Sequence, residues 1–278
     1  MSDRFIPSRA LRLFQSLRFP RKLGFGELIW SRSLASHGVT WVAFSGLKWK
    51  LNLANDTHRW LVYGEYEELG VRTLLEGVLR PDDVIIDSGA NIGQMILMYM
   101  RVERSLRIYA FEPTPQARDW LAECLRANEL STVAVNGIAL GQSAETESLI
   151  LHDFHFKEGA KDYVTAGGSG TPIEVTTLDS FTREQGIGRI RFWKLDVEGG
   201  ELNALRGARV LLQRGRIDYL YIETAAAGDE IFDELAKSDY LAVSFERDRA
   251  LEKNAVTARR CNVFASPLVS RDECRLDC

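Results

Sequence analysis

The sequence predicts an α/β fold built on a mostly parallel sheet that helices cover on both faces. From residue 84 onward, short apolar runs alternate with segments of helical spacing, and repeated strand–helix units of this kind form parallel sheets. The expected strands are 84–87, 106–113, 131–140, 190–199 and 217–225, and the expected helices are 93–104, 115–130, 200–215 and 229–239. Segments 147–154 and 172–181 are expected to be additional extended pieces around the glycine-rich stretch 165–172.

Both ends of the chain depart from this alternation. Segments 241–247 and 260–267 are expected strands without a helix between them, which predicts an antiparallel hairpin at one edge of the sheet. Residues 40–63 alternate and carry turn signals, which predicts two or three short antiparallel strands, and residues 65–79 have helical spacing before a proline. We therefore expect an N-terminal extension over residues 1–64 and one α/β domain over residues 65–278.

The composition is that of an ordinary globular protein. Of the 278 residues, 45% are apolar and 27% are charged, and the formal net charge of −4 gives no reason to expect nucleic-acid binding. The four cysteines lack zinc-ligand spacing and no secretory signal pattern precedes them, so we expect a reducing cytoplasm and assign no role to Cys274 and Cys278. No apolar run reaches the roughly 18 residues of a membrane-spanning helix.

A basic amphipathic segment lies near the start of the chain. Residues 9–22, RALRLFQSLRFPRK, interleave three leucines and two phenylalanines with four arginines and one lysine. Two interpretations stay open at this point. In the first, the segment forms a helix that packs on its own domain or on a second subunit of a homo-oligomer. In the second, it makes peripheral contact with an anionic membrane surface.

The stretch DVIIDSGANIGQ, residues 83–94, predicts a ligand-binding turn. A buried strand delivers Asp87 to its carboxyl end, and Gly89 and Gly93 let the backbone turn sharply and approach a ligand. The following helix offers free N–H groups to an anion. About twenty residues later, Glu112 ends the next strand, where an acid commonly binds both hydroxyls of a ribose.

NAD and S-adenosylmethionine both contain such a ribose. The turn reads D-S-G-A-N-I-G and lacks the G-x-G-x-x-G spacing that suits a pyrophosphate, and the chain holds no Tyr-x-x-x-Lys pair for hydride chemistry. A methionine tail instead carries an ammonium group that needs acceptors such as Asp87. The residues therefore favour S-adenosylmethionine, with an NAD(P)-dependent oxidoreductase or epimerase as the alternative.

A second cluster, FWKLDVEGGE, predicts chemistry at the same sheet edge. Alternation places Lys194, Asp196 and Glu198 on one side of the strand, and Glu223 ends the neighbouring strand. Three interpretations stay open: a carboxylate acts as general base for a substrate hydroxyl, the acids Asp196, Glu198 and Glu223 hold Mg²⁺ or a similar cation, or they bind the cofactor, Lys194 or helix N–H groups without chemistry.

Taken together, the motifs resemble those of the FkbM-type methyltransferases. VIIDSGANIGQ, AFEPTP, VNGIALG, TLDSF, KLDVEGGELNALRG and YIE occur in that family's order, and the upstream YGEYEE is similar to its first motif. The resemblance implies a Rossmann-like class I methyltransferase fold with a seven-stranded sheet and S-adenosylmethionine as methyl donor. It also implies O-methylation of a hydroxyl-bearing acceptor, such as a sugar in a glycan or a natural-product scaffold.

The resemblance also implies roles for single residues. Asp87, Gly89, Asn91 and Gly93 match the methionine-binding turn, Glu112 matches the ribose acid, and Asn136, Ile138 and Ala139 match the segment that borders adenine. Asp196 and Glu198 match the catalytic edge, with Asp196 also near the cofactor, and Glu67 matches the motif that caps the pocket. Two positions depart from the family pattern: Ser88 stands in place of the usual small apolar residue, and Gly200 in place of the usual alanine.

Two further expectations concern the acceptor side. The N-terminal strands and the loop 165–171 are expected to shape the acceptor pocket, and the glycines of that loop allow it to close as a lid. Beside the enzyme, a non-catalytic module that only binds S-adenosylmethionine remains an alternative.

Overall fold

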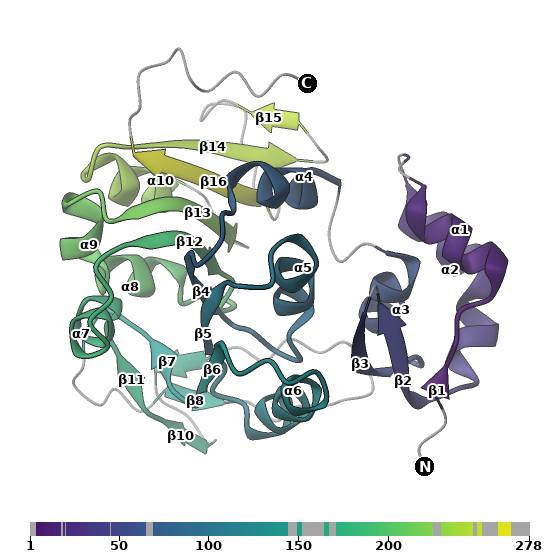
Figure 1. Ribbon diagram of the computed structural model, residues 1–278. Helices are drawn as coiled ribbons and strands as arrows, with labels where there is room; N and C mark the ends of the chain where they lie inside the picture. The colour runs from purple at the N-terminus through teal and green to yellow at the C-terminus, as the bar shows by residue number, and fades with distance from the viewer. Residues whose placement is uncertain are drawn as a thin grey trace.

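The computed structural model describes residues 4–17, 19, 21–44, 46–64, 69–143, 149–151, 164–166, 171–224, 229–246, 249–251 and 261–267. Its centre is an eight-stranded sheet with the strand order β15-β14-β16-β13-β12-β4-β5-β6 (Figure 1). The strands are β4 (Val84–Ser88), β5 (Arg107–Phe111), β6 (Val133–Asn136), β12 (Ile190–Leu195), β13 (Ile217–Thr224), β14 (Tyr240–Glu246), β15 (Arg249–Leu251) and β16 (Cys261–Pro267).

The sheet confirms the predicted Rossmann-like class I architecture. Strands β6, β5, β4, β12 and β13 pair in parallel, and β16 pairs antiparallel with both β13 and β14. Seven strands were expected, and the short strand β15 adds an eighth at the edge. The predicted antiparallel pairing of the last two long strands is confirmed, and the pair lies toward one edge of the sheet, with β16 between β13 and β14 and the short β15 outermost.

Helices cover the two faces of the sheet, as predicted. Along β4 the side chain of Ile85 joins one apolar core and that of Ile86 the other, because successive side chains of a strand point to opposite faces. The first core includes residues of α4 (Leu69–Val78), α5 (Gln94–Val102) and α6 (Pro115–Ala127). The second includes residues of α7 (Leu178–Glu184), α8 (Glu201–Arg206), α9 (Arg209–Gln213) and α10 (Asp229–Ala236).

Three predicted segments are interrupted in the structure. The expected strand 131–140 divides into β6 and β7 (Ala139–Leu140), and β7 pairs with β11 (Val175–Thr176) outside the main sheet. The expected extended segment 172–181 turns into helix α7, because the Thr177 side chain accepts the Ser180 N–H as a helix cap. The expected helix 200–215 divides into α8 and α9 at Gly207, whose Cα approaches the carbonyl of Gly141 too closely for any side chain.

A second small sheet lies beside β7 and β11. It has the order β10-β8-β9 and consists of β8 (Leu149–Leu151), β9 (Val164–Ala166) and β10 (Thr171–Ile173), each antiparallel to its neighbour. This confirms that 147–154 and 172–181 contain extended pieces. Most of the predicted lid, residues 167–170, lies outside the described residues.

The N-terminal extension packs against the first core, beside α5 and α6 (Figure 1). It comprises β1 (Arg4–Phe5), α1 (Arg9–Ser16), α2 (Lys22–Ala35), β2 (Val39–Phe44), β3 (Leu47–Asn52) and α3 (Asp56–Tyr63). Strands β2 and β3 form the predicted antiparallel pair, whereas β1 pairs in parallel with β2. In the described part of the chain, no helix is both long and apolar enough to cross a bilayer.

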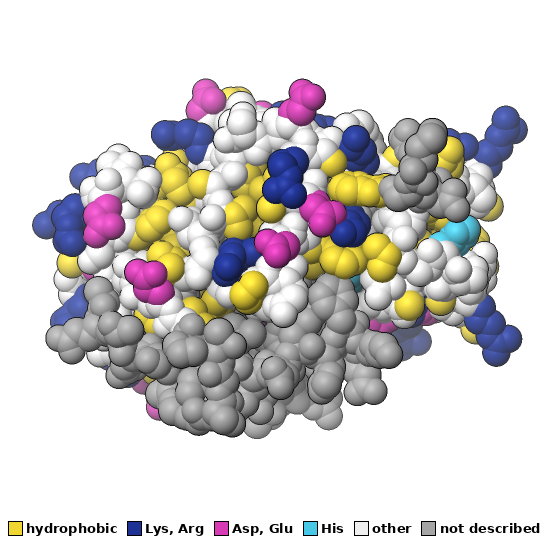
Figure 2. Space-filling view, turned by 90° about the horizontal axis from the view of Figure 1, so that it is seen from below, with side chains coloured by type: hydrophobic (Ala, Val, Ile, Leu, Met, Phe, Trp, Pro, Cys, Tyr) yellow, Lys and Arg dark blue, Asp and Glu magenta, His cyan; other side chains and the backbone are white. Residues whose placement is uncertain are grey.

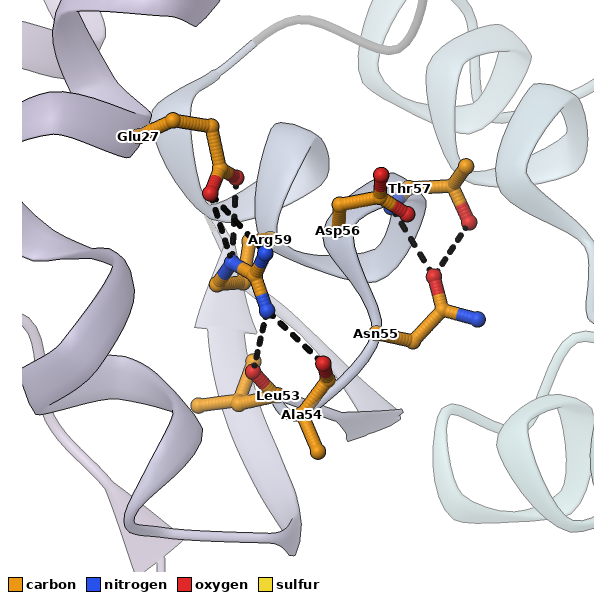
Figure 3. Close-up of polar contacts among 7 residues, drawn as sticks. All are labelled: Glu27, Leu53, Ala54, Asn55, Asp56, Thr57 and Arg59. Atoms are coloured by element: carbon orange, nitrogen blue, oxygen red, sulfur yellow. Dashed lines mark hydrogen bonds and ion pairs between the residues drawn. The ribbon is translucent and has the colours of Figure 1, made fainter. Parts of the chain in front are cut away.

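Two of the two or three strands expected within residues 40–63 are present, and residues 56–63, where a third would lie, form helix α3. The Asn55 side chain caps this helix by accepting the Thr57 N–H at 2.9 Å. Arg59 then fixes the helix in place: its guanidinium donates to Glu27 of α2 and to the carbonyls of Leu53 and Ala54 (Figure 3). Helical spacing and this buried guanidinium outweigh the alternation seen in the sequence.

Candidate functional site

Asp87 lies at the carboxyl end of β4, at the centre of the sheet, and is fully buried. Among the described residues, neither of its carboxylate oxygens has a hydrogen-bond partner. Burial raises the pKa of Asp87 to about 6, although the nearby Lys194 ammonium opposes this shift. A buried carboxylate without donors is costly, so this group points to a cationic or hydrogen-bond-donating ligand.

The turn after Asp87 requires glycine. Gly89 has a φ of 74°, and a Cβ atom at this position would overlap the carbonyl oxygen of Asp196, just after the adjacent strand β12. The N–H groups of Gly89 and Ala90 both donate to the carbonyl of Phe111, at 2.9 and 3.1 Å. The turn is therefore packed between β5 and the loop that follows β12.

Glu112 is held beside this turn by two backbone amides. Asn91 N donates to its Oε2 at 2.7 Å and Thr114 N to its Oε1 at 2.9 Å. Burial raises the pKa of Glu112, while these two hydrogen bonds act in the opposite direction. Since each carboxylate oxygen can accept more than one hydrogen bond, both oxygens retain capacity for a pair of hydroxyl groups.

Trp49 of the N-terminal extension supports the same turn, which sequence reasoning missed. Its indole Nε1 donates to the carbonyl of Ile92 at 2.9 Å, and its ring lies where a Cβ atom on Gly93 would be. Gly93 has a φ of 84° and precedes helix α5. In the sequence, Trp49 is one aromatic residue of an alternating strand, so nothing distinguishes it from an ordinary core residue.

At the end of β12, Lys194 lies between the acids. Its Nζ donates to Asp196 Oδ2 at 2.8 Å and to the Gly89 carbonyl at 3.4 Å. The register places Lys194 directly beside Asp87, so the two side chains share one face of the sheet. This ammonium is only 2% exposed and balances part of the negative charge of the site.

Glu198 follows in a loop with a left-handed backbone, at a φ of 51°. Its pKa is raised to about 7, first by burial and then by the negative charges of Asp196 and Glu201. Glu201, which sequence reasoning did not single out, closes the loop by accepting the N–H groups of Val197 and Gly199 at 3.1 and 3.0 Å. The only sequence signal for this role is an acid at the first position of a helix after two glycines.

Glu223 lies near the end of β13 and is partly exposed. Leu195 of β12 pairs with Ile222 of β13, so Asp196 and Glu223, the residues that follow, come at the same edge of the sheet. Within the described ranges, however, no three or more His, Cys, Asp or Glu side chains form a group that could hold a metal ion. The three acids proposed for Mg²⁺ thus share one edge but do not form such a group.

The segment expected to border adenine is tied to the protein backbone. Asn136 Nδ2 donates to the Ala110 carbonyl at 3.1 Å, and Ala139 N donates to the Glu174 carbonyl at 2.9 Å. Ile138 packs against the second core.

Beside this segment, Arg118 lies against Gly137 and donates to the carbonyls of Glu112 and Pro113, at 3.2 and 2.7 Å, a contact that the sequence did not reveal. Glu67, expected to cap the pocket, lies outside the described residues.

Three curated relatives resemble this chain. It is 31% identical over 159 residues to methyltransferase sdnD of Sordaria araneosa, covering 46% of this chain and 61% of the relative. It is 25% identical to 2-O-methyltransferase NoeI of Sinorhizobium fredii, covering 53% and 66%, and 27% identical to hexuronic acid methyltransferase AglP of Haloferax volcanii, covering 57% and 62%. The matches span about three fifths to two thirds of the length of these relatives.

A sequence model for the whole family gives the assignment. The family described as "Methyltransferase FkbM domain" matches residues 87–243, which is more than half of the chain and includes Asp87, Glu112, Asp196 and Glu223. The predicted resemblance is therefore confirmed, and the chain belongs to the FkbM methyltransferase family.

Proposed function

We propose that this protein is an S-adenosylmethionine-dependent O-methyltransferase. The observation that carries the proposal is the fully buried Asp87 carboxylate, which has no hydrogen-bond partner in the described part of the chain. The ammonium group of a methionine tail would supply the donors that this carboxylate lacks. The Gly89 turn would let the tail approach the backbone, and Glu112 would accept the two ribose hydroxyls.

These residues fit S-adenosylmethionine better than NAD(P). A pyrophosphate is an anion, and the Asp87 carboxylate, which Lys194 balances only in part, would repel it in a buried site. A sulfonium cofactor is cationic at both its sulfur and its ammonium group, so it would be attracted to the acids Asp87, Asp196 and Glu198. When bound, S-adenosylmethionine supplies an electrophilic methyl group, and the protein has chiefly to align a nucleophile and exclude water.

Glu198 is our candidate for the general base. A base operates best when its pKa is near the working pH, and the pKa of Glu198 is raised to about 7. Asp196 is less suited, because Lys194 Nζ donates to its carboxylate at 2.8 Å and competes for the lone pairs that would take a proton. We assign Asp196 and Glu223 to positioning the acceptor hydroxyl at the sheet edge.

For the acceptor we propose a sugar hydroxyl. AglP is a hexuronic acid methyltransferase and NoeI a 2-O-methyltransferase, and both match this chain over more than half of its length. An alkyl hydroxyl has a pKa far above 7, so its methylation depends on a base, which agrees with acids rather than apolar residues at this edge.

Two experiments test the proposal. Calorimetric titration with S-adenosylhomocysteine, NAD and NADP should give about micromolar affinity for S-adenosylhomocysteine alone. Binding of NAD instead would refute S-adenosylmethionine as the methyl donor. A tritiated methyl donor should then label uronic-acid-containing oligosaccharides. Glu198→Gln should lose about a hundredfold or more in rate while S-adenosylhomocysteine affinity stays within a few-fold.

The matched control is Glu184→Gln on the exposed surface of α7, which should leave both quantities unchanged. Donor binding without any methyl transfer, over a broad acceptor screen, would favour the non-catalytic module.

A further inference from the structure

Helix α2 presents an apolar strip to the solvent. Phe25, Leu28 and Ile29 are 50%, 82% and 59% exposed, although large apolar side chains on a surface helix normally face the core. Their spacing of three and four residues places them on one side of the helix. Arg21 and Arg32 extend this strip at both ends, four residues before Phe25 and four residues after Leu28.

Helix α1, which contacts α2 through the Phe14 and Trp30 rings, also carries exposed apolar side chains. Leu13 is 64% exposed and Leu17, at the end of the helix, is 45% exposed. The opposite side of the helix is already packed, since Leu11 and Phe14 are buried and the Phe14 ring contacts Trp30 of α2 at 4.8 Å between centroids. The exposed side chains are therefore not needed for holding the extension together.

Residues 4–38 carry a strong excess of positive charge. Residues 4–38 contain seven lysines and arginines and a single acid, Glu27, in a chain whose net charge is −4. Glu27 turns inward to Arg59, whose Nε and Nη2 donate to its carboxylate at 3.0 and 2.8 Å (Figure 3). Arg9, Arg12, Arg21 and Arg32 are all exposed. In Figure 2, Lys and Arg side chains project from the right-hand end, where the extension lies.

We propose that the outer faces of α1 and α2 bind the surface of an anionic lipid bilayer. Here "lipid face" means the exposed residues Leu13, Leu17, Phe25, Leu28 and Ile29 together with Arg9, Arg12, Arg21 and Arg32. Helices that lie in a membrane interface combine apolar side chains, which enter the headgroup region, with flanking cations that bind acidic headgroups.

Charge decides between this partner and a second copy of the chain. Two lipid faces brought together would place eight arginines near one another, with the one acid of the segment already bound to Arg59. Like charges across an interface oppose association, whereas an acidic bilayer neutralises them. The positive face also stands out against a chain of negative net charge, which is otherwise repelled by acidic lipids.

Vesicle flotation of the full chain tests the proposal, with phosphatidylcholine vesicles compared to vesicles that also contain phosphatidylserine. We expect binding to the acidic vesicles only, and weaker binding at high salt. The variant Leu28→Gln/Ile29→Gln should bind about tenfold or more weakly. Arg12→Gln/Arg32→Gln should bind about 25-fold more weakly, from about fivefold for each arginine near the surface.

The matched control is Arg209→Gln/Val210→Gln, an exposed arginine and an exposed valine on α9, on the far side of the domain from the extension (Figure 1). It should bind as the wild type does. Failure of the wild type to float with acidic vesicles, equal binding to neutral vesicles, or full binding by the glutamine variants would each overturn the proposal. A dimer in solution that Leu28→Gln/Ile29→Gln dissociates, without lipid binding, would show an interface between copies instead.

Discussion

Replacement of Asp87 by asparagine should stabilise the ligand-free protein and, at the same time, abolish the proposed binding of S-adenosylmethionine. Burial raises the pKa of Asp87 from 3.8 to about 6, and this shift corresponds to about 3 kcal/mol of destabilisation when the carboxylate is charged. The asparagine amide has a similar shape but no charge. It leaves the ion pair between Lys194 and Asp196 intact, and its own unsatisfied N–H groups cost about 1–2 kcal/mol. The net gain is therefore about 1–2 kcal/mol at pH 7.5.

The pH dependence of this gain identifies its cause. Because the pKa of Asp87 is higher in the folded state, the folded protein binds the proton more tightly, and the wild type loses stability as the pH rises from about 4 to about 6. Lowering the pH from 7.5 to 5 should thus restore about 1.4 kcal/mol to the wild type through Asp87, a contribution that Asp87→Asn lacks. Other groups that titrate in this range, such as Glu198, act in both proteins and cancel in the comparison. The cost of the asparagine amide is the same at both pH values, so it cancels in this comparison.

Urea unfolding of both proteins at pH 7.5 and pH 5 measures the effect, and Asp82→Asn serves as the matched control because Asp82 is exposed. The control should leave the pH dependence of the wild type unchanged. Calorimetry should in addition show at least a hundredfold loss of S-adenosylhomocysteine affinity for Asp87→Asn. If Asp87→Asn is less stable than the wild type at pH 7.5, with a difference that does not change at pH 5, the assignment of Asp87 as an unpaired buried carboxylate is refuted.

Three further predictions follow from the site. Gly89→Ala should lower the free energy of unfolding by about 3 kcal/mol or more, because the added methyl group would overlap the Asp196 carbonyl. Gly186→Ala is the control: Gly186 has a similar φ of 66° but open space around it, so the loss should be about 1 kcal/mol. Urea unfolding measures both. Trp49→Phe removes the hydrogen bond to the Ile92 carbonyl in the turn after β4, and it should lower the free energy of unfolding by about 2 kcal/mol. Calorimetry should show S-adenosylhomocysteine binding about fivefold more weakly; an unchanged affinity would show that the turn keeps its shape without this hydrogen bond. The methyl-transfer rate should rise with pH up to about 7 and then level off, as Glu198 loses its proton, and a rate already constant from pH 5.5 upward would exclude Glu198 as the base.

The main sheet was predictable because its signals are local. Mostly apolar segments that lead into acidic residues, such as 84–87 and 190–196, indicate buried strands, and their alternation with helices leaves few arrangements of a parallel sheet. The predictions failed where a distant contact decides the conformation. Helix α3 lies where a third strand was left open, and it is held by Arg59, which donates to Glu27, 32 residues away in the sequence.

The same division applies to the site. The sequence by itself determined which chemical groups arrive at the carboxyl edge, since the glycine turn around Gly89 and the strand-end acids Asp87 and Glu112 belong to short continuous motifs. Only the tertiary structure decided their electrostatic state. Burial raises the pKa of Asp87 to about 6 against the opposing effect of the Lys194 ammonium, which comes from a strand more than a hundred residues further along the chain. Burial also raises the pKa of Glu198 to about 7, with a further contribution from the acids Asp196 and Glu201 beside it in the sequence. Desolvation and Coulomb interactions depend on what surrounds a group in space, and a linear motif does not contain that information.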